Sequence, residues 1–146
     1  MANGVLKQRG CRRRLDPVRA DRAAPGSAWS VPRVAECVQV STTLPDEATA
    51  QQFGRRLVEE RLAACAQIAG PISSTYWWEG QVQEASEWSC HLKTTSAVSA
   101  ELSRRIRALH PYEVPEIIVL AIKEGDASYL KWIGDTVRPS PKVPVP

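Results

Sequence analysis

Seven consecutive residues combine side chains that can move a proton or bind a metal ion. The segment His110-Pro111-Tyr112-Glu113-Val114-Pro115-Glu116 contains an imidazole, a phenol and two carboxylates. Each proline fixes its own φ angle and pushes the residue before it toward extended backbone. We therefore expect a stiff segment that presents polar side chains and is neither a helix nor a flexible loop.

The candidate metal ligands in this segment are His110, Glu113 and Glu116. Imidazole and carboxylate groups suit Cu(II) among the divalent cations. The chain has only two histidines, His91 and His110, so one chain offers few nitrogen ligands. We expect weak binding of Cu(II) or another divalent cation. The alternative is that His110 is a cation at a helix C-terminus, where the helix dipole favours it.

A second candidate site would bind a small anionic metabolite or a nucleotide. One cation, flat rings and orienting carboxylates are typical of such a cleft. Lys93 lies on the polar side of a predicted strand, just before a predicted helix N-terminus, where anions are favoured. The candidate ligand-binding residues are Lys93, Trp77, Glu79, Tyr112 and Glu113. The alternative is that the aromatic residues anchor a subunit interface and that Lys93 forms an ion pair.

Hydrophobic periodicity predicts the elements that hold these residues. Apolar residues recur at helical spacing in two long segments, and alternation or short apolar runs mark the strands. The predicted strands cover 34–43, 65–78 with an interruption at Gly70-Pro71, 82–95 and 117–122. The predicted helices run from the start signal at 42–47 to about Leu62, from 96 to about Leu109, and from Asp126 to Val137.

The order β-α-β-β-α-β plus a C-terminal helix predicts an α+β fold, the ferredoxin-like split βαβ sandwich. Right-handed crossovers place both long helices on one face of a four-stranded antiparallel sheet. The segment 117–122 is apolar on both faces, which predicts a buried central strand. The long hairpin carries Tyr76-Trp77-Trp78 at its tip, and such an aromatic patch favours contact with another subunit.

Composition and local patterns limit the domain organisation and the kinds of partner that we expect for the chain. Residues 1–33 contain eight Lys or Arg residues against Asp16 and Asp21, and no periodic pattern, so we expect a disordered basic tail there. We expect a single domain over 34–137 and a Pro-rich tail over 138–146. No apolar run is long enough to span a membrane, no secretory signal pattern is present, and no motif indicates specific nucleic-acid binding.

Further motifs distributed over about Val34 to Val137 resemble those of the CutA divalent-cation-tolerance family. Four groups of residues carry the resemblance together with 110–116. They are Thr43-Leu44-Pro45-Asp46-Glu47-Ala48-Thr49-Ala50 with Glu60-Arg61-Leu62-Ala63-Ala64-Cys65, Tyr76-Trp77-Trp78-Glu79-Gly80, Leu92-Lys93-Thr94-Thr95, and Tyr129-Leu130-Lys131-Trp132-Ile133.

The resemblance implies a cytoplasmic homotrimer linked to tolerance of copper and other divalent metals. It also implies that long hairpins join the sheets of neighbouring subunits. The trimer resembles that of the PII signalling proteins, which suggests the alternative function of a signalling trimer with an inter-subunit ligand cleft. No catalytic motif is present, and we expect no enzymatic activity.

Two positions depart from the family pattern. Some members carry a Cys at the end of the first strand that has been connected with copper, and Thr42 occupies that place here. Some carry two adjacent histidines before the Pro-Tyr pair, and this chain has Leu109 and His110. A soft ligand and one imidazole are therefore absent, which weakens the expectation of a strong copper site.

Overall fold

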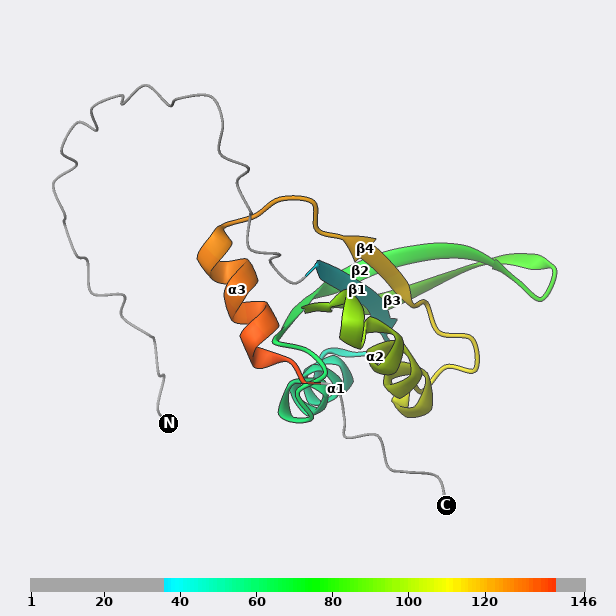
Figure 1. Cartoon of the computed structure of the whole chain (residues 1–146). Helices are drawn as coiled ribbons and strands as arrows, with labels where there is room; N and C mark the ends of the chain where they lie inside the picture. The colour runs from blue at the N-terminus through cyan, green and yellow to red at the C-terminus, as the bar shows by residue number, and fades with distance from the viewer. Residues whose placement is uncertain (1–35, 139–146) are drawn as a thin grey trace, which may run out of the picture. The chain divides into compact units, whose positions relative to one another are not determined.

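The computed structural model describes residues 36–138, so the expected tail 1–33 and all but the first residue of 138–146 lie outside it. Its elements follow the predicted order, with a terminal helix (Figure 1). They are β1 (Cys37–Leu44), α1 (Glu47–Glu59), β2 (Cys65–Trp78), β3 (Gln81–Thr95), α2 (Ser96–Leu109), β4 (Ile118–Ala121) and α3 (Ala127–Thr136).

Local hydrogen bonds define both ends of α1. The Asp46 carboxylate accepts the backbone N–H and the hydroxyl of Thr49, both at 2.8 Å, and so caps the first turn. At the other end the Leu62 N–H donates to the Leu57 carbonyl at 3.1 Å. Arg61 lies between them with a φ of 61°, the left-handed conformation that ends many helices. The helix therefore ends before the expected residue 62.

Strands β2 and β3 form the predicted long hairpin. They pair antiparallel from Cys65 opposite Lys93 to Trp78 opposite Gln81. The two-residue turn Glu79-Gly80 has φ angles of 50° and 79°, as a hairpin turn of the primed type requires. The register shifts between Ala69 and Ile72, which confirms the irregularity predicted at Gly70-Pro71.

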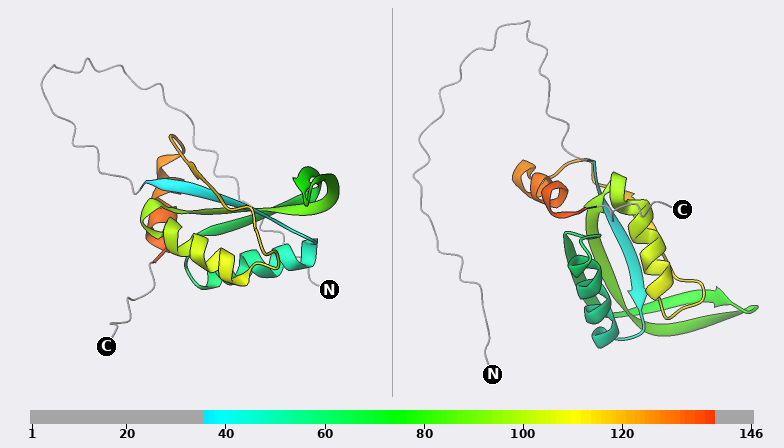
Figure 2. Two further views of the ribbon diagram at one scale, coloured as in Figure 1. Left: turned by 90° about the vertical axis from the view of Figure 1, so that its right-hand side faces the viewer. Right: turned by 60° about the horizontal axis from the view of Figure 1, so that its bottom comes forward.

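The four strands make one antiparallel sheet in the order β2-β3-β1-β4. Helices α1 and α2 lie side by side on one face of it, and α3 lies at one end (Figure 2). The fully buried large apolar side chains fill the space between sheet and helices; they are Val40, Leu44, Leu57, Leu92, Val98, Leu102, Ile106 and Ile133. This arrangement is the expected ferredoxin-like α+β fold.

Strand β4 differs from its prediction. Among the described strands it pairs only with β1, at the edge of the sheet. Its apolar side chains are exposed: Ile118 at 45%, Val119 at 46% and Leu120 at 52%. The prediction of a buried central strand was therefore wrong within this chain. A run that is apolar on both faces does not specify which surface covers it, because another part of the chain and another chain satisfy it equally.

The three cysteines of the described region form no disulfide bond with one another. Cys37 and Cys90 are buried, as expected for cysteines that act as small apolar residues. Burial raises the pKa of Cys90 to about 12, so this thiol stays protonated at neutral pH. Cys65 is half-buried on β2. Within residues 36–138, no helix is long and apolar enough to cross a membrane.

Candidate functional site

The segment 110–116 leaves the C-terminus of α2 and returns toward β4, without helix or strand structure over 111–117. Its first residue, His110, is held against the end of β1. The His110 Nε2 lies 3.0 Å from the Thr43 carbonyl oxygen and 3.1 Å from Thr42 Oγ1. The ring also meets Phe53 of α1 edge to face, with 5.7 Å between ring centroids. The sheet and α1 thus fix where the segment starts.

The second ring nitrogen of His110 determines the protonation state. The backbone N–H of Tyr112 donates to His110 Nδ1 at 3.1 Å, so Nδ1 carries the lone pair and the proton of the neutral ring lies on Nε2. The Nε2–H group of His110 donates to the carbonyl oxygen of Thr43. Burial lowers the pKa of His110, against smaller opposing effects of the Thr43 carbonyl and the Glu87 carboxylate. Both ring nitrogens are therefore occupied by protein groups at neutral pH.

Tyr112 is the second anchor of the segment. Its ring lies 5.1 Å from that of His110. Burial and a hydrogen bond to the Glu87 carboxylate raise the pKa of Tyr112 to about 12. Glu87 belongs to β3 and is only 7% exposed. The phenol therefore supplies a donor to a buried carboxylate, which would be costly to bury without one.

The carboxylates expected to bind metal lie on the outer side of this anchored segment. Glu113 and Glu116 are exposed, whereas Pro115 between them is buried. Within residues 36–138, no three His, Cys, Asp or Glu side chains are close enough together to hold a metal ion. His110, Glu113 and Glu116 thus share one short segment but do not form a ready-made three-ligand cluster in a single chain.

The five candidate cleft residues do not gather in one place within a chain. Trp77 and Glu79 lie at the hairpin tip, and Lys93 lies opposite Cys65 at the far end of the hairpin. From Val82, the partner of Trp77, to Lys93 the strand covers roughly 36 Å at 3.3 Å per residue. Tyr112 contacts Glu87, which lies between these two ends of β3, and Glu113 follows Tyr112 in the chain. Within residues 36–138 these five residues therefore do not form one cleft.

Lys93 has a neutral partner where it lies. Its Nζ donates to the amide oxygen of Gln67 at 2.5 Å. In the part of the chain that the structure describes, Lys93 forms no ion pair. The expected alternative of a Lys93–carboxylate pair is therefore not found within residues 36–138.

Two residues contribute to the site without having been selected from the sequence. Strand alternation assigned Glu87 to the polar side of β3, but it is buried and contacts Tyr112, 25 positions away. Thr42 was noted because it occupies the place of a possible Cys ligand, and the structure gives it a different role. It is 1% exposed and hydrogen-bonds the His110 ring. No sequence pattern signals either long-range contact.

The chain is similar to known proteins along most of its described length. A family model described as CutA1 divalent ion tolerance protein matches residues 38–136. A "Divalent-cation tolerance protein CutA" from Thermus thermophilus is 46% identical over 94 residues, which are 64% of this chain and 91% of that protein. The chain covers 91% of a relative of the same name from Citrobacter koseri at 39% identity over 105 residues, 72% of its own length.

Solved structures agree in fold. The CutA1 structure from Oryza sativa has a TM-score of 0.70 and 36% identity, covering 73% of this chain and 97% of that one. A CutA from Archaeoglobus fulgidus, described as a periplasmic divalent cation tolerance protein, has a TM-score of 0.67 and 36% identity over 70% of this chain and 99% of its own. The family match, the relatives and the shared fold lead to one conclusion: the chain belongs to the CutA1 divalent ion tolerance protein family.

Proposed function

We propose that the chain acts in divalent-cation tolerance as a non-enzymatic homotrimer that binds Cu(II) or another divalent cation weakly through the segment 110–116. One observation supports the proposed cation site. His110 and Tyr112 anchor a stiff segment, and its two carboxylates, Glu113 and Glu116, are exposed. Carboxylate oxygens suit divalent cations. A site with two exposed carboxylates and no preformed third ligand is expected to be weak.

His110 has a distinct role in this proposal. With Nε2 bonded to Thr43 and Nδ1 accepting from Tyr112, the ring has no free lone pair. It therefore holds the segment, and Glu113 and Glu116 contact the ion. His110 as a direct ligand stays a prediction, and it requires the ring to exchange the Tyr112 N–H for the metal.

Calorimetric titration with Cu(II) separates these roles. Wild-type protein is expected to show weak saturable binding, and the double variant Glu113→Gln/Glu116→Gln is expected to lose it. Glu84→Gln/Glu124→Gln removes equal charge from exposed positions and serves as the matched control. His110→Gln should weaken binding less than the double variant does. No heat above a chelator control, or equal losses in both double variants, would refute the site.

The homotrimer is supported by apolar surface that one chain leaves open. At the hairpin tip Trp77 is 72% exposed and Val82 is 62% exposed, and on β4 Leu120 is 52% exposed. Patches of this kind are typical of protein interfaces. Light scattering is expected to give three times the chain mass of 16.1 kDa. The variant Trp77→Ser/Val82→Ser should shift the mass downward, and a monomeric wild type would contradict the proposal.

A second candidate function, a PII-like signalling trimer that binds a small anion, is favoured by Lys93. The residue as a whole is half-buried, and its ammonium group has only a neutral amide as partner in the described residues. In this proposal an inter-subunit cleft near Lys93 binds the anion. Inorganic phosphate should raise the melting temperature of the wild type, because a ligand that binds only the folded state stabilises it. The shift should be absent in Lys93→Gln.

The proposal includes a cytoplasmic location. Fractionation of cells that carry the tagged full chain is expected to recover it with the cytoplasmic proteins. Recovery in an exported fraction would contradict this part of the proposal and leave the cation and anion sites unaffected.

A further inference from the structure

The arginines of the described region gather on the two helices that cover the sheet. Residues 36–138 contain seven arginines, and all of them lie on α2, on the second half of α1, or beside the end of α1. Six of the seven are exposed and the remaining one is half-buried. This surface, the arginine patch, consists of Arg55, Arg56, Arg61, Arg104, Arg105, Arg107 and Arg138.

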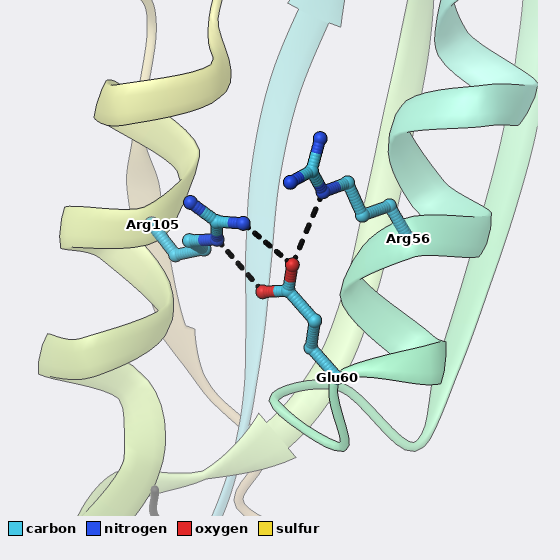
Figure 3. Close-up of polar contacts among 3 residues, drawn as sticks. All are labelled: Arg56, Glu60 and Arg105. Atoms are coloured by element: carbon cyan, nitrogen blue, oxygen red, sulfur yellow. Dashed lines mark hydrogen bonds and ion pairs between the residues drawn. The ribbon is translucent and has the colours of Figure 1, made fainter.

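Contacts at the end of α1 connect the two helices within the patch. The Glu60 carboxylate accepts from Arg105 of α2 at 2.6 and 2.7 Å and from Arg56 of α1 at 3.1 Å (Figure 3). Arg61 follows Glu60 directly, and its carbonyl accepts the Arg138 N–H at 2.9 Å. The arginines are thus neighbours in space although they come from three separate parts of the chain.

A groove between α1 and α2 runs through the patch. It has a volume of about 470 Å³, and Leu62 and Ala108 give it an apolar part. Arg104 forms one of its walls, and Arg107 lies one turn further along the same side of α2. Neither of these two arginines forms an ion pair with another residue that the structure describes. The groove is lined by Glu60, Leu62, Glu101, Arg104, Arg105 and Ala108.

Charge is strongly segregated over the described residues. Three carboxylates, Glu59, Glu60 and Glu101, lie among the seven arginines, so the patch has a net charge of +4. The rest of residues 36–138 holds three lysines against eleven carboxylates, a net charge of −8 with histidine neutral. Such a separation gives the helical face a positive potential, which attracts an anionic partner and orients it.

The composition of the patch favours an acidic peptide over a nucleic acid. Its cations are all arginines, whose planar guanidinium groups bind carboxylates and phosphates through paired hydrogen bonds. No aromatic ring lines the groove for bases to stack on. A phosphate backbone is charged at every nucleotide and would meet the three carboxylates. A peptide can place neutral side chains there and an apolar side chain against Leu62 and Ala108.

The two ends of this chain do not match the patch in charge. Residues 1–33 contain eight Lys or Arg residues against Asp16 and Asp21, and residues 139–146 contain Lys142 as their only charged side chain. Both segments would be repelled by the arginines. The exposed apolar residues that support the homotrimer lie on the hairpin and on β4, outside the patch. The proposed homotrimer therefore does not use this surface.

We propose that the arginine patch is a docking surface for an acidic segment of a partner protein, which lies along the groove between α1 and α2. Arginine clusters are a common means of binding acidic motifs. Arg104 and Arg107 bind carboxylates of the segment, and an apolar side chain of the segment contacts Leu62 and Ala108. The inference adds a class of partner to the proposed function and does not depend on the cation site or on the Lys93 site.

Fluorescence anisotropy with labelled peptides and the full chain tests the proposal. A peptide with the repeat Glu-Glu-Val is expected to bind, and a peptide with the repeat Gln-Gln-Val is not. Rising salt concentration should weaken the binding, because exposed charges are screened. A peptide with the repeat Glu-Glu-Ser should bind about threefold more weakly, because it has no apolar side chain to bury. Equal affinities of the two acidic peptides would refute the use of the groove.

The decisive variant is Arg104→Gln/Arg107→Gln. It should weaken the binding of the Glu-Glu-Val peptide about tenfold, because two exposed ion pairs are lost. Its melting temperature should equal that of the wild type, since both side chains are exposed and form no ion pair with a described residue. Unchanged peptide affinity in this variant would refute the proposal.

Two control variants remove equal charge elsewhere. Lys123→Gln/Lys131→Gln changes exposed lysines outside the patch, and Arg12→Gln/Arg13→Gln changes the basic N-terminal residues. Both should keep the affinity within about twofold of the wild type. A loss as large as that of the patch variant would show that affinity follows overall charge, which refutes the proposal.

Two further measurements test the other occupants. Duplex DNA is expected to bind more weakly than the Glu-Glu-Val peptide. Tighter binding of DNA that depends on Arg104 and Arg107 would make the patch a nucleic-acid surface and refute the proposal. Light scattering at low salt should give the same mass for the wild type and Arg104→Gln/Arg107→Gln. A larger mass for the wild type would mean that another copy of this chain occupies the patch, which also refutes the proposal.

Discussion

The Tyr112 backbone N–H donates to Nδ1 of His110 at 3.1 Å, so the histidine ring and the segment that follows it hold each other in place. The bond exists only while Nδ1 is unprotonated, because a protonated ring would point an N–H at an N–H. The other nitrogen donates to Thr43 and fixes the ring against β1. The attachment of the segment 110–116 to the sheet is therefore coupled to the protonation of one imidazole.

This coupling predicts a loss of stability in acid. Burial lowers the pKa of His110 below its ordinary 6.5, so the unfolded chain takes up the proton first as the pH falls. The contribution is fully present above pH 6.5 and is lost as the pH falls through the lowered folded-state pKa. Glu87, the carboxylate that faces the ring, opposes the shift and limits the effect.

Urea unfolding at a series of pH values measures this loss of stability in acid. Between about pH 7.5 and pH 5 the wild type should lose more unfolding free energy than His110→Gln, which cannot titrate there. His91→Gln removes the other histidine and should follow the wild type. Parallel curves for the wild type and His110→Gln would contradict the coupling.

Tyr112→Phe removes the donor that satisfies a buried carboxylate. Glu87 is 7% exposed and would lose its phenol partner while the ring shape is conserved. A hydrogen bond to a charged group contributes roughly 1.5–3 kcal/mol, so the free energy of unfolding should fall by about that amount. Tyr76→Phe on β2, where the tyrosine is 42% exposed, is the control and should change stability little. Chemical denaturation measures the free energy of unfolding of both variants, and an equally small change in both would contradict the role of the Tyr112 phenol.

The two long helices are joined by one carboxylate. Glu60 follows α1 and accepts from Arg105 of α2 at 2.6 and 2.7 Å, and from Arg56 of α1 at 3.1 Å (Figure 3). Arg105, and to a smaller extent Arg56, lowers the pKa of the Glu60 carboxyl. The stabilisation is therefore present above the ordinary pKa of 4.5 and is lost as the pH falls through the lowered value.

We expect Arg105→Ala to destabilise the fold more than Arg56→Ala. Arg105 makes two parallel bonds between separate helices, whereas Arg56 makes one bond within its own turn, and exposed pairs four residues apart contribute little. Thermal melts at neutral pH compare the stability of the two variants. In a Glu60→Gln background the two arginine variants should be nearly equal in stability. If Arg105→Ala remains the less stable there, Glu60 does not join the two helices as described.

The sequence predicts those parts of the fold that depend on local patterns. The β-α-β-β-α-β order, the turn at Glu79-Gly80 and the irregularity at Gly70-Pro71 all follow from periodicity and turn chemistry, and all are confirmed. Strand β4 was misplaced because an apolar run indicates contact with apolar surface but does not identify that surface. In this chain the run lies at the sheet edge.

The candidate site was less accessible to sequence reasoning. Motif spacing located the segment 110–116, but the role of His110 depends on Thr43, 67 positions away, and on the direction of the Tyr112 N–H. The placement of Lys93 between Cys65 and Gln39 likewise depends on the register between β1, β2 and β3. Long-range pairing of this kind has no signal in the order of residues along one strand.

Arg61 occupies a position that favours glycine. Its φ of 61° follows α1, and a side chain in this conformation carries strain that glycine avoids. Within residues 36–138 its guanidinium makes one long bond, of 3.4 Å, to the Thr136 carbonyl oxygen. Arg61→Gly should raise the free energy of unfolding by roughly 0.5–1 kcal/mol. Gln52→Gly, at an exposed position inside the helix, should lower it by about 1 kcal/mol. Urea unfolding that shows a loss for both would contradict this account.

Gly54 lies where α1 contacts the sheet, and here glycine is expected to be more favourable than a larger residue. Alanine is favoured over glycine inside a helix by about 1 kcal/mol. However, a Cβ at position 54 would lie 2.9 Å from the Ala66 Cβ on β2, with Ile68 and the Cys90 sulfur 3.5 and 3.6 Å away. Overpacking a close contact costs roughly 1–3 kcal/mol, so the clash should outweigh the gain in helix propensity.

We therefore expect Gly54→Ala to reduce the free energy of unfolding, and Gly54→Ala/Ala66→Gly to recover part of the loss because the second change removes the atom in conflict. Gln52→Ala gives the propensity effect alone at an exposed position of the same helix and should be mildly stabilising. If Gly54→Ala is as stable as Gln52→Ala in urea, the helix can move away from β2, and the close approach of α1 to the sheet is not required for the fold.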